Sequence, residues 1–238
     1  MNAAELSDRL VEVSTAEDRL LQTVSKLSEA GLRDPSLLPG WTRGHVLAHV
    51  ALNAHSLVNL FTWARTGAET PQYPSWEERD ADIERHSGKT IEQHRTALAE
   101  AGAAFADAAR AVPLERWDHD VAGIGGEPQA AAAFLFGRLR EVEIHHVDLD
   151  AGYVPSDWDD AFVRRVLEQV PARLSAGASA PFAAAATDLG MRVEVGDAPA
   201  TAKVAGAGHA VLAWLLGRSD GTGLDVRGGS LPQVAPWA

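Results

Sequence analysis

Cysteine is absent from this sequence of 238 residues. Its absence excludes disulfide bonds, zinc sites built from cysteine and a thiol nucleophile supplied by the chain itself. Any metal site must therefore use histidine, aspartate or glutamate side chains. Any sulfur chemistry must use a thiol that comes from outside the protein.

Positive charge and long apolar runs are scarce as well. The chain has 21 Lys and Arg against 33 Asp and Glu, which gives a formal net charge of -12. Nucleic acids and anionic membranes require a basic surface, so we expect neither as a partner. No run of about 18 apolar residues and no export signal is found. We therefore expect a cytoplasmic protein without a membrane-spanning segment.

The first part of the chain has the periodicity of helices. Apolar residues recur at intervals of three and four, and Thr42 and Thr90 stand where the N-terminal caps of helices are expected. We predict long helices at about residues 3–29, 42–66, 90–112 and 129–150. The segment GAETPQYPSWEERD is expected to be a loop or a short helix start. Four long helices joined by loops favour a bundle with sites between facing helices.

The pattern changes after Gly152. An amphipathic helix at about residues 158–174 is followed by the short alternating segments MRVEV, TAKVAG and LDVRG, which are typical of strands. A further helix, AGHAVLAWLLGR, lies between the second and third of these segments. We therefore predict an α plus α/β fold, with a helix bundle at residues 1–153 and a small C-terminal α/β domain at residues 154–238.

The second and fourth predicted helices carry candidate metal ligands. His45 and His49 are four residues apart, as are Glu141 and His145, and residues at this spacing share one helix face. Two imidazoles and a carboxylate with an open fourth position are typical of catalytic zinc sites. The spacing does not decide between His45 and His49. Histidines at this spacing also occur as hydrogen-bonded core or surface residues.

Glu143 and His146 lie on the same turn as these candidates but face another direction. We interpret them as solvated groups or as groups that support the ligands. The remaining histidines have no spacing typical of ligands; they are His55, His86, His94, His119 and His209.

Two long stretches, LPGWTRGHVLAHVALNAHSLVNL and REVEIHHVDLDAG, resemble the mycothiol-dependent maleylpyruvate isomerase family, whose N-terminal part is a DinB-like metal-binding four-helix bundle. GAETPQYPSWEERDADI and AWLLGRSDG extend the resemblance over nearly the whole chain. The resemblance implies that His49, Glu141 and His145 are the metal ligands. It also implies that Arg79 and Arg218 act in catalysis and in binding of the cofactor, at a site where the two domains meet.

The resemblance further implies an enzyme that converts maleylpyruvate to fumarylpyruvate in the degradation of aromatic compounds of the gentisate type. Its cofactors would be zinc, or another divalent metal, and mycothiol. Addition of a thiolate to the cis double bond would permit rotation, and elimination would then give the trans product. An external thiol agrees with the absence of cysteine.

The expected partners are a small-molecule substrate and the thiol cofactor, and we expect a monomer. Two alternatives remain open. One is another mycothiol-dependent transferase on the same scaffold, such as an enzyme that conjugates the thiol to an electrophile. The other is a metal-binding protein without enzymatic activity.

Overall fold

The computed structural model describes residues 1–174 and 180–234 of the chain. The chain divides into two compact units, of which the first spans Met1–Tyr153 and the second begins at Val154. The first unit is dominated by helices, whereas the described residues of the second form a four-stranded sheet with two α-helices. The fold class predicted from the sequence, a helix bundle followed by an α/β part, is therefore confirmed.

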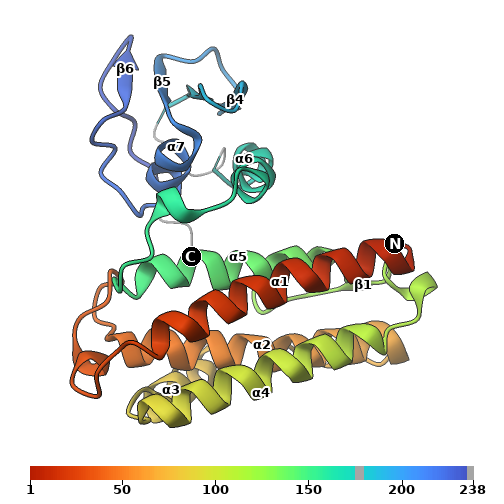
Figure 1. Ribbon diagram of the computed structural model, residues 1–238. Helices are drawn as coiled ribbons and strands as arrows, with labels where there is room; N and C mark the ends of the chain where they lie inside the picture. The colour runs from red at the N-terminus through yellow and green to blue at the C-terminus, as the bar shows by residue number, and fades with distance from the viewer. Residues whose placement is uncertain (175–179, 235–238) are drawn as a thin grey trace. The chain divides into compact units, whose positions relative to one another are not determined.

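The first unit is a bundle of long helices (Figure 1). Its four long helices are α1 (Ala3–Val24), α2 (Arg43–Thr66), α4 (Ile91–Arg110) and α5 (Ala133–Asp148). α1 packs against α4 and α5, and α2 packs against the same two helices, so each long helix contacts two of the other three. The core is formed by apolar residues at helical spacing, including Leu10, Val13, Leu47, Val50, Phe61, Phe105, Leu135 and Val142. Burial of each large apolar side chain contributes roughly 1.5–3 kcal/mol.

The ends of α2 follow from its local sequence. Thr42 is the N-cap residue, and its hydroxyl lies 2.7 Å from Nδ1 of His45 in the first turn. Gly67 ends the helix with a φ of 77°, a left-handed conformation that glycine adopts without steric cost. Both boundaries agree with the prediction.

α3 (Trp76–Ser87) begins near the end of the segment that was expected to be a loop or a short helix start, and it continues seven residues beyond that segment. Ser75 caps it by accepting a hydrogen bond of 3.1 Å from the backbone N–H of Glu78. Ile83 is the only buried residue among the twelve in this helix. Apolar periodicity is therefore almost missing, which explains why the sequence pattern did not predict a full helix.

Two other helix boundaries differ from the prediction. α1 ends at Val24, five residues before the predicted end. α5 begins only at Ala133, because Gln129 and Ala130 form the short strand β2 and pair with β1 (Asp120–Val121). Turns and strand pairing at the helix ends depend on contacts with neighbouring segments. Helical periodicity carries no information about these contacts.

The second unit has the sheet order β4-β3-β5-β6. Its elements are α6 (Asp160–Leu174), β3 (Phe182–Ala186), β4 (Met191–Val195), β5 (Ala202–Gly206), α7 (Gly208–Leu215) and β6 (Asp225–Arg227). β3 runs antiparallel to β4 and parallel to β5, while β5 runs antiparallel to β6. α7 packs on β3 and β5, and α6 packs on β4 and α7.

Within this sheet, β3 is the strand that the sequence pattern did not predict. Its sequence, FAAAA, is rich in alanine, which favours helix rather than strand. The strand lies between β4 and β5, and four of its five residues are buried. Pairing on both edges and packing against α7 therefore override the local preference for helix.

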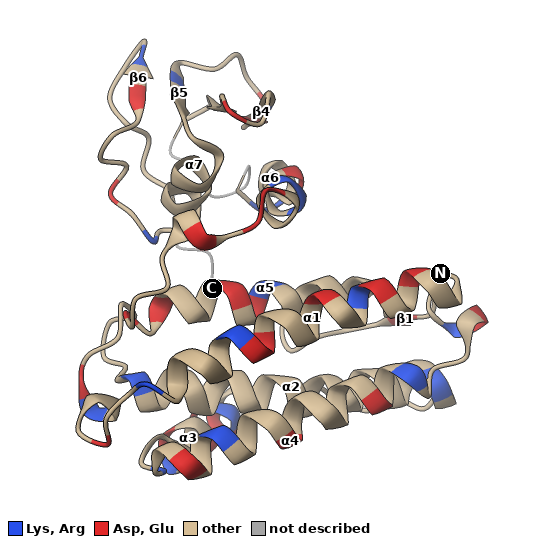
Figure 2. Cartoon of the chain, in the orientation of Figure 1, with Lys and Arg blue, Asp and Glu red and all other residues tan. Residues whose placement is uncertain are grey.

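The helices of the bundle have charged outer faces. Figure 2 shows acidic and basic residues interspersed along them. On α1, Asp8 and Glu12 are exposed, whereas Leu10 and Val13 are buried. This is the amphipathic pattern expected of a helix that covers an apolar core. No helix in residues 1–174 and 180–234 is both long and apolar enough to cross a membrane.

Candidate metal centre

His49 on α2 meets Glu141 and His145 on α5. Nε2 of His49 lies 3.0 Å from Oε2 of Glu141 and 3.1 Å from Nε2 of His145. Nε2 of His145 lies 3.5 Å from the same carboxylate oxygen. Tetrahedral zinc with bonds of about 2.0–2.1 Å separates its ligand atoms by about 3.3–3.4 Å. The three atoms thus have the spacing of a divalent metal site, and they are the one such group among the described residues.

The chemistry of the three groups also fits a cation. A neutral imidazole carries one N–H, and a carboxylate carries none, so the facing atoms offer more lone pairs than protons. Two Nε2 atoms 3.1 Å apart can share only one proton between them. A divalent metal would satisfy all three lone pairs together.

The cluster lies at the edge of the core. The side chain of His49 is only 6% exposed, whereas that of Glu141 is 25% exposed and that of His145 is 14% exposed. A further ligand can therefore approach from the side of Glu141. This access is typical of a catalytic site and not of a closed structural site.

The protonation states follow from burial and from mutual contacts. Burial lowers the pKa of His49 to about 4. Burial also acts to lower the pKa of His145, but hydrogen bonds to Asp148 and Glu141 outweigh it and raise this pKa to about 9. For Glu141, burial acts to raise the pKa, whereas hydrogen bonds with His145 and His49 hold it well below its ordinary value. At neutral pH the cluster thus contains one neutral imidazole, one carboxylate and one imidazolium, and a cation would displace the proton of the imidazolium.

His45, the alternative ligand on α2, lies outside the cluster. Its Nδ1 atom contacts the hydroxyl of Thr42, and its Nε2 atom lies 3.0 Å from Oε2 of Glu84. Both ring nitrogens are therefore occupied at the beginning of α2. Of the two histidines between which the spacing left the choice open, His49 is the one that meets Glu141.

Glu143 and His146 are buried, at 2% and 1% exposure. Glu143 accepts hydrogen bonds from the hydroxyl of Tyr153, at 2.5 Å, and from Arg19. Nε2 of His146 lies 2.7 Å from the hydroxyl of Thr23, and its ring stacks on Tyr153 with centroids 3.8 Å apart. The interpretation as solvated groups is wrong. α5 packs against α1 as well as α2, so both of its polar faces are covered.

Arg79 on α3 lies beside the cluster. Its Nη2 atom is 3.3 Å from Nδ1 of His49, and its Nη1 atom donates a hydrogen bond of 2.6 Å to Asp80. The guanidinium carbon lies 5.5 Å from the ring centroid of Trp76, a cation–π contact. The structure therefore brings one of the two predicted arginines to the candidate metal ligands.

Arg218, the other predicted arginine, follows α7 in the second unit. Its Nη1 atom donates a hydrogen bond of 2.7 Å to the carbonyl of Leu216. This contact lies in the turn after the helix, as expected for a cation near a helix C-terminus. Its role in binding a ligand stays a prediction.

Two residues near the cluster were missed by the sequence analysis. Oδ2 of Asp148 lies 2.8 Å from Nδ1 of His145, and the ring centroid of Trp41 lies 5.6 Å from that of His49. Asp148 could have been found, because Glu141, His145 and Asp148 are spaced as positions that share one helix face. Trp41 precedes α2, where helical spacing carries no information.

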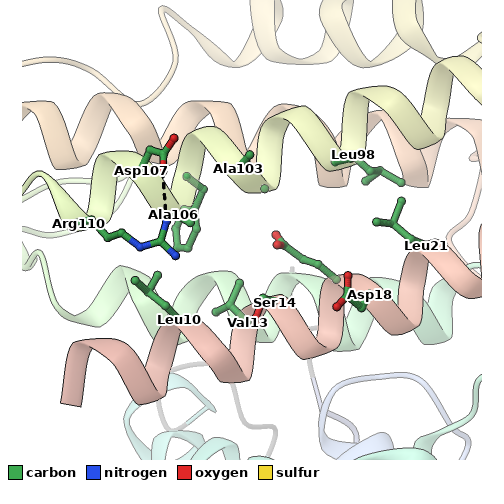
Figure 3. A pocket seen from close by; sticks show the side chains of 14 residues that line it. Leu10, Val13, Ser14, Asp18, Leu21, Leu98, Ala103, Ala106, Asp107 and Arg110 are labelled. Carbon is green, nitrogen blue, oxygen red and sulfur yellow. Dashed lines mark hydrogen bonds and ion pairs between the residues drawn. The ribbon is translucent and has the colours of Figure 1, made fainter. Parts of the chain in front are cut away.

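A separate hollow of about 310 Å³ lies between α1 and α4 (Figure 3). Its lining includes the apolar residues Leu10, Leu21 and Leu98, and Arg110 is paired with Asp107 at 3.1 Å near one end. No candidate metal ligand lines this hollow. It is therefore distinct from the metal centre.

Comparisons with known proteins show what the chain is similar to. The model of the family described as mycothiol maleylpyruvate isomerase N-terminal domain matches residues 13–150, which include the three clustered residues. The crystal structure of the mycothiol-dependent maleylpyruvate isomerase is 30% identical, with a TM-score of 0.90 over 98% of this chain and 97% of that chain. A histidine-to-alanine mutant described by the same name is 29% identical, with the same TM-score and coverage. No curated protein matches the chain.

Proposed function

The chain belongs to the mycothiol maleylpyruvate isomerase family, and from this premise we propose that it catalyses the mycothiol-dependent cis–trans isomerisation of maleylpyruvate to fumarylpyruvate. One observation carries the proposal. The similarity to the solved isomerase covers 98% of this chain and 97% of that chain, at a TM-score of 0.90. It therefore includes both units and not the bundle alone.

In this proposal His49, Glu141 and His145 hold zinc or another divalent metal. When bound, the metal would act as a Lewis acid toward an oxygen or sulfur ligand, while the thiol would add reversibly to the double bond and so permit its rotation. The chain supplies two nitrogen ligands and one oxygen ligand, a set that suits zinc and also other divalent ions. The exposed edge of Glu141 leaves room for the fourth ligand.

Arg79 would bind a carboxylate of the substrate or of the thiol cofactor next to the metal. A guanidinium can donate two parallel hydrogen bonds to a carboxylate, which fixes both distance and orientation. Contacts with Asp80 and Trp76 hold the guanidinium beside His49 before a ligand arrives. We assign Arg218 a similar carboxylate-binding role on the basis of the family resemblance. A cytoplasmic location and a monomeric state stay predictions.

The experiment that tests the proposal supplies mycothiol and maleylpyruvate to the purified protein and follows both the organic product and the free thiol. We expect the trans isomer to form only when mycothiol is present, with no net loss of thiol. Loss of free thiol during turnover would instead indicate a conjugating enzyme. Binding of zinc without any reaction would indicate a metal-binding protein that is not this isomerase.

The role of Arg79 is tested by Arg79→Lys, with Arg85→Lys as the matched control. Arg85 lies on the same helix but is exposed and pairs with Asp82. Lysine keeps the charge but loses the paired hydrogen bonds, so we expect kcat/KM to fall about 10- to 100-fold for Arg79→Lys alone. Equal kcat/KM for both variants would remove Arg79 from the site.

A further inference from the structure

We propose that Asp148 is a positioning residue of the metal centre, whose carboxylate orients His145 so that Nε2 faces the other two ligands. This inference rests on the proposed metal site and adds a residue to it. Oδ2 of Asp148 lies 2.8 Å from Nδ1 of His145, and the side chain of Asp148 is fully buried. On the other side of the ring, Nε2 of His145 faces Nε2 of His49 at 3.1 Å.

The contact determines which nitrogen can bind a metal. An ionised carboxylate only accepts hydrogen bonds, so Nδ1 of His145 must carry the proton in this contact. When the ring is neutral, Nε2 then presents its lone pair to the cluster. Carboxylates that accept a hydrogen bond from the second nitrogen of a ligating histidine fix both the tautomer and the ring orientation.

The backbone around Asp148 is held in place as well. The N–H of Leu37 donates a hydrogen bond of 2.9 Å to the carbonyl of Asp148. The guanidinium of Arg43 donates to the carbonyls of Leu149, at 2.7 Å, and Asp150, at 2.6 Å. These carbonyls lie at the C-terminal end of α5, where no intrahelical N–H reaches them. The carboxylate is therefore carried by an anchored helix end.

The two candidate imidazoles are oriented in different ways. Nδ1 of His49 faces the guanidinium of Arg79 at 3.3 Å, and its ring is buried against Trp41. His145 is more exposed than His49 and has the carboxylate of Asp148 on its Nδ1 atom. Packing and the contact with Arg79 thus restrain His49, whereas the carboxylate of Asp148 restrains His145. Loss of the carboxylate is expected to loosen His145 alone.

The proposal is tested with Asp148→Asn, and Asp150→Asn serves as the matched control. Asp150 undergoes the same chemical change two residues later, is exposed, and has a φ of 50°, which asparagine tolerates. The zinc dissociation constant is measured by competition with a chromophoric chelator, and the unfolding temperature is measured in parallel. We expect Asp148→Asn to weaken zinc binding by about 10- to 100-fold. Asp150→Asn should bind as tightly as the wild type.

The outcomes separate this inference from the proposed function. Wild-type protein that binds no zinc would overturn the metal site and the role of Asp148 together. Wild-type protein that binds zinc, with equal affinity in folded Asp148→Asn, would overturn the positioning role alone. A lower unfolding temperature of Asp148→Asn without a change in zinc affinity would show that the contact between Asp148 and His145 stabilises the fold only, and would also overturn the positioning role.

A second measurement requires no substitution. Wild-type protein labelled with ¹⁵N is loaded with ¹¹³Cd, and the coupling between metal and nitrogen identifies the ligating atom of each histidine. We expect coupling to Nε2 of His145, together with a slowly exchanging Nδ1–H that is protected by Asp148. Coupling to Nδ1 of His145 would overturn the proposal.

Discussion

Two faces of α5 carry similar residues in different arrangements. Glu141 and His145 point toward α2, whereas Glu143 and His146 pack with residues of α1 and with Tyr153. On the α1 side, the carboxylate of Glu143 accepts hydrogen bonds from a phenol and a guanidinium. On the α2 side, two imidazole nitrogens and a carboxylate oxygen face one another at 3.0–3.5 Å.

The two faces differ in how many hydrogen-bond donors meet the lone pairs of their side chains. Burial alone does not separate them, because Glu143 and His146 are more deeply buried than Glu141 and His145. A buried polar group whose lone pairs meet donors is satisfied and acts in the structure. A group of convergent lone pairs without enough donors is suited to a cation. Residue type and helical position are nearly the same on the two faces.

The largest expected effect comes from a substitution in the cluster on the α2-facing side of α5. Glu141→Gln removes the negative charge and the anionic oxygen from the cluster, so we expect zinc to be lost from the purified protein and turnover to fall on the order of 1000-fold. Zinc content is measured by plasma mass spectrometry and turnover by the isomerisation assay. Glu143→Gln is the control and should retain both. Stoichiometric zinc in Glu141→Gln would show that the α2-facing carboxylate is not required for metal binding.

A buried histidine outside both faces provides a test by pH. His94 on α4 is 1% exposed, and burial lowers its pKa to about 4 from an ordinary value of 6.5. Because the folded pKa lies below the unfolded one, the unfolded chain takes up the proton first as the pH falls. Stability should therefore decrease from about pH 6.5 downward, by about 3 kcal/mol at pH 4 for this group.

The corresponding variant is His94→Gln, which keeps a side-chain donor near the carbonyl of Ser87, 3.4 Å from Nε2 of His94. The free energy of unfolding is measured by denaturant titration between pH 4 and 7. We expect a shallower loss of stability in the variant than in the wild type, with the part due to His49 remaining. Parallel curves for the two proteins would show that His94 contributes nothing to the pH dependence.

Glu143→Gln should show the opposite profile to Glu141→Gln. The amide cannot match the charged acceptor for Arg19 and Tyr153, so we expect the free energy of unfolding to fall by about 2 kcal/mol. Zinc content and kcat should stay at the wild-type level. A loss of zinc without a loss of stability would place Glu143 in the metal centre. It would then be wrong that only the α2-facing side of α5 binds metal.

The smallest expected effect comes from Tyr153→Phe. The ring that stacks on His146 is kept, and only the hydroxyl that donates to Glu143 is removed. We expect a decrease of about 1 kcal/mol in the free energy of unfolding. A double-mutant cycle with Glu143→Gln measures the coupling between the two groups. Fully additive effects would mean that this hydrogen bond does not stabilise the α1-facing network.

Several parts of the candidate site could be predicted from local spacing. Glu141 and His145 are four residues apart, and this places them on one face of α5 in any helix that contains them. The N-terminal cap at Thr42 and the glycine at position 67 define α2, which carries His49. The assignment of His49 over His45 came only with the family resemblance, because spacing treats the two residues alike.

Other parts depend on contacts between distant segments. α3 has a single buried residue, so its pattern did not indicate a full helix or that Arg79 lies near His49. The alanine-rich strand β3 is a strand because β4 and β5 pair with its two edges. The burial of His146 arises from α1, whose Thr23 is 123 positions away in the chain.

The sequence by itself determined the long helices, the absence of any internal thiol and the faces of α5 on which each pair of polar residues lies. These properties depend on caps, periodicity and residue type, which are local. Only the tertiary structure decided which of the two faces gathers lone pairs and which completes a hydrogen-bond network. The reason is that donors and acceptors are matched between helices, and α1, α2 and α3 bring their partners to α5 and to each other from distant parts of the chain.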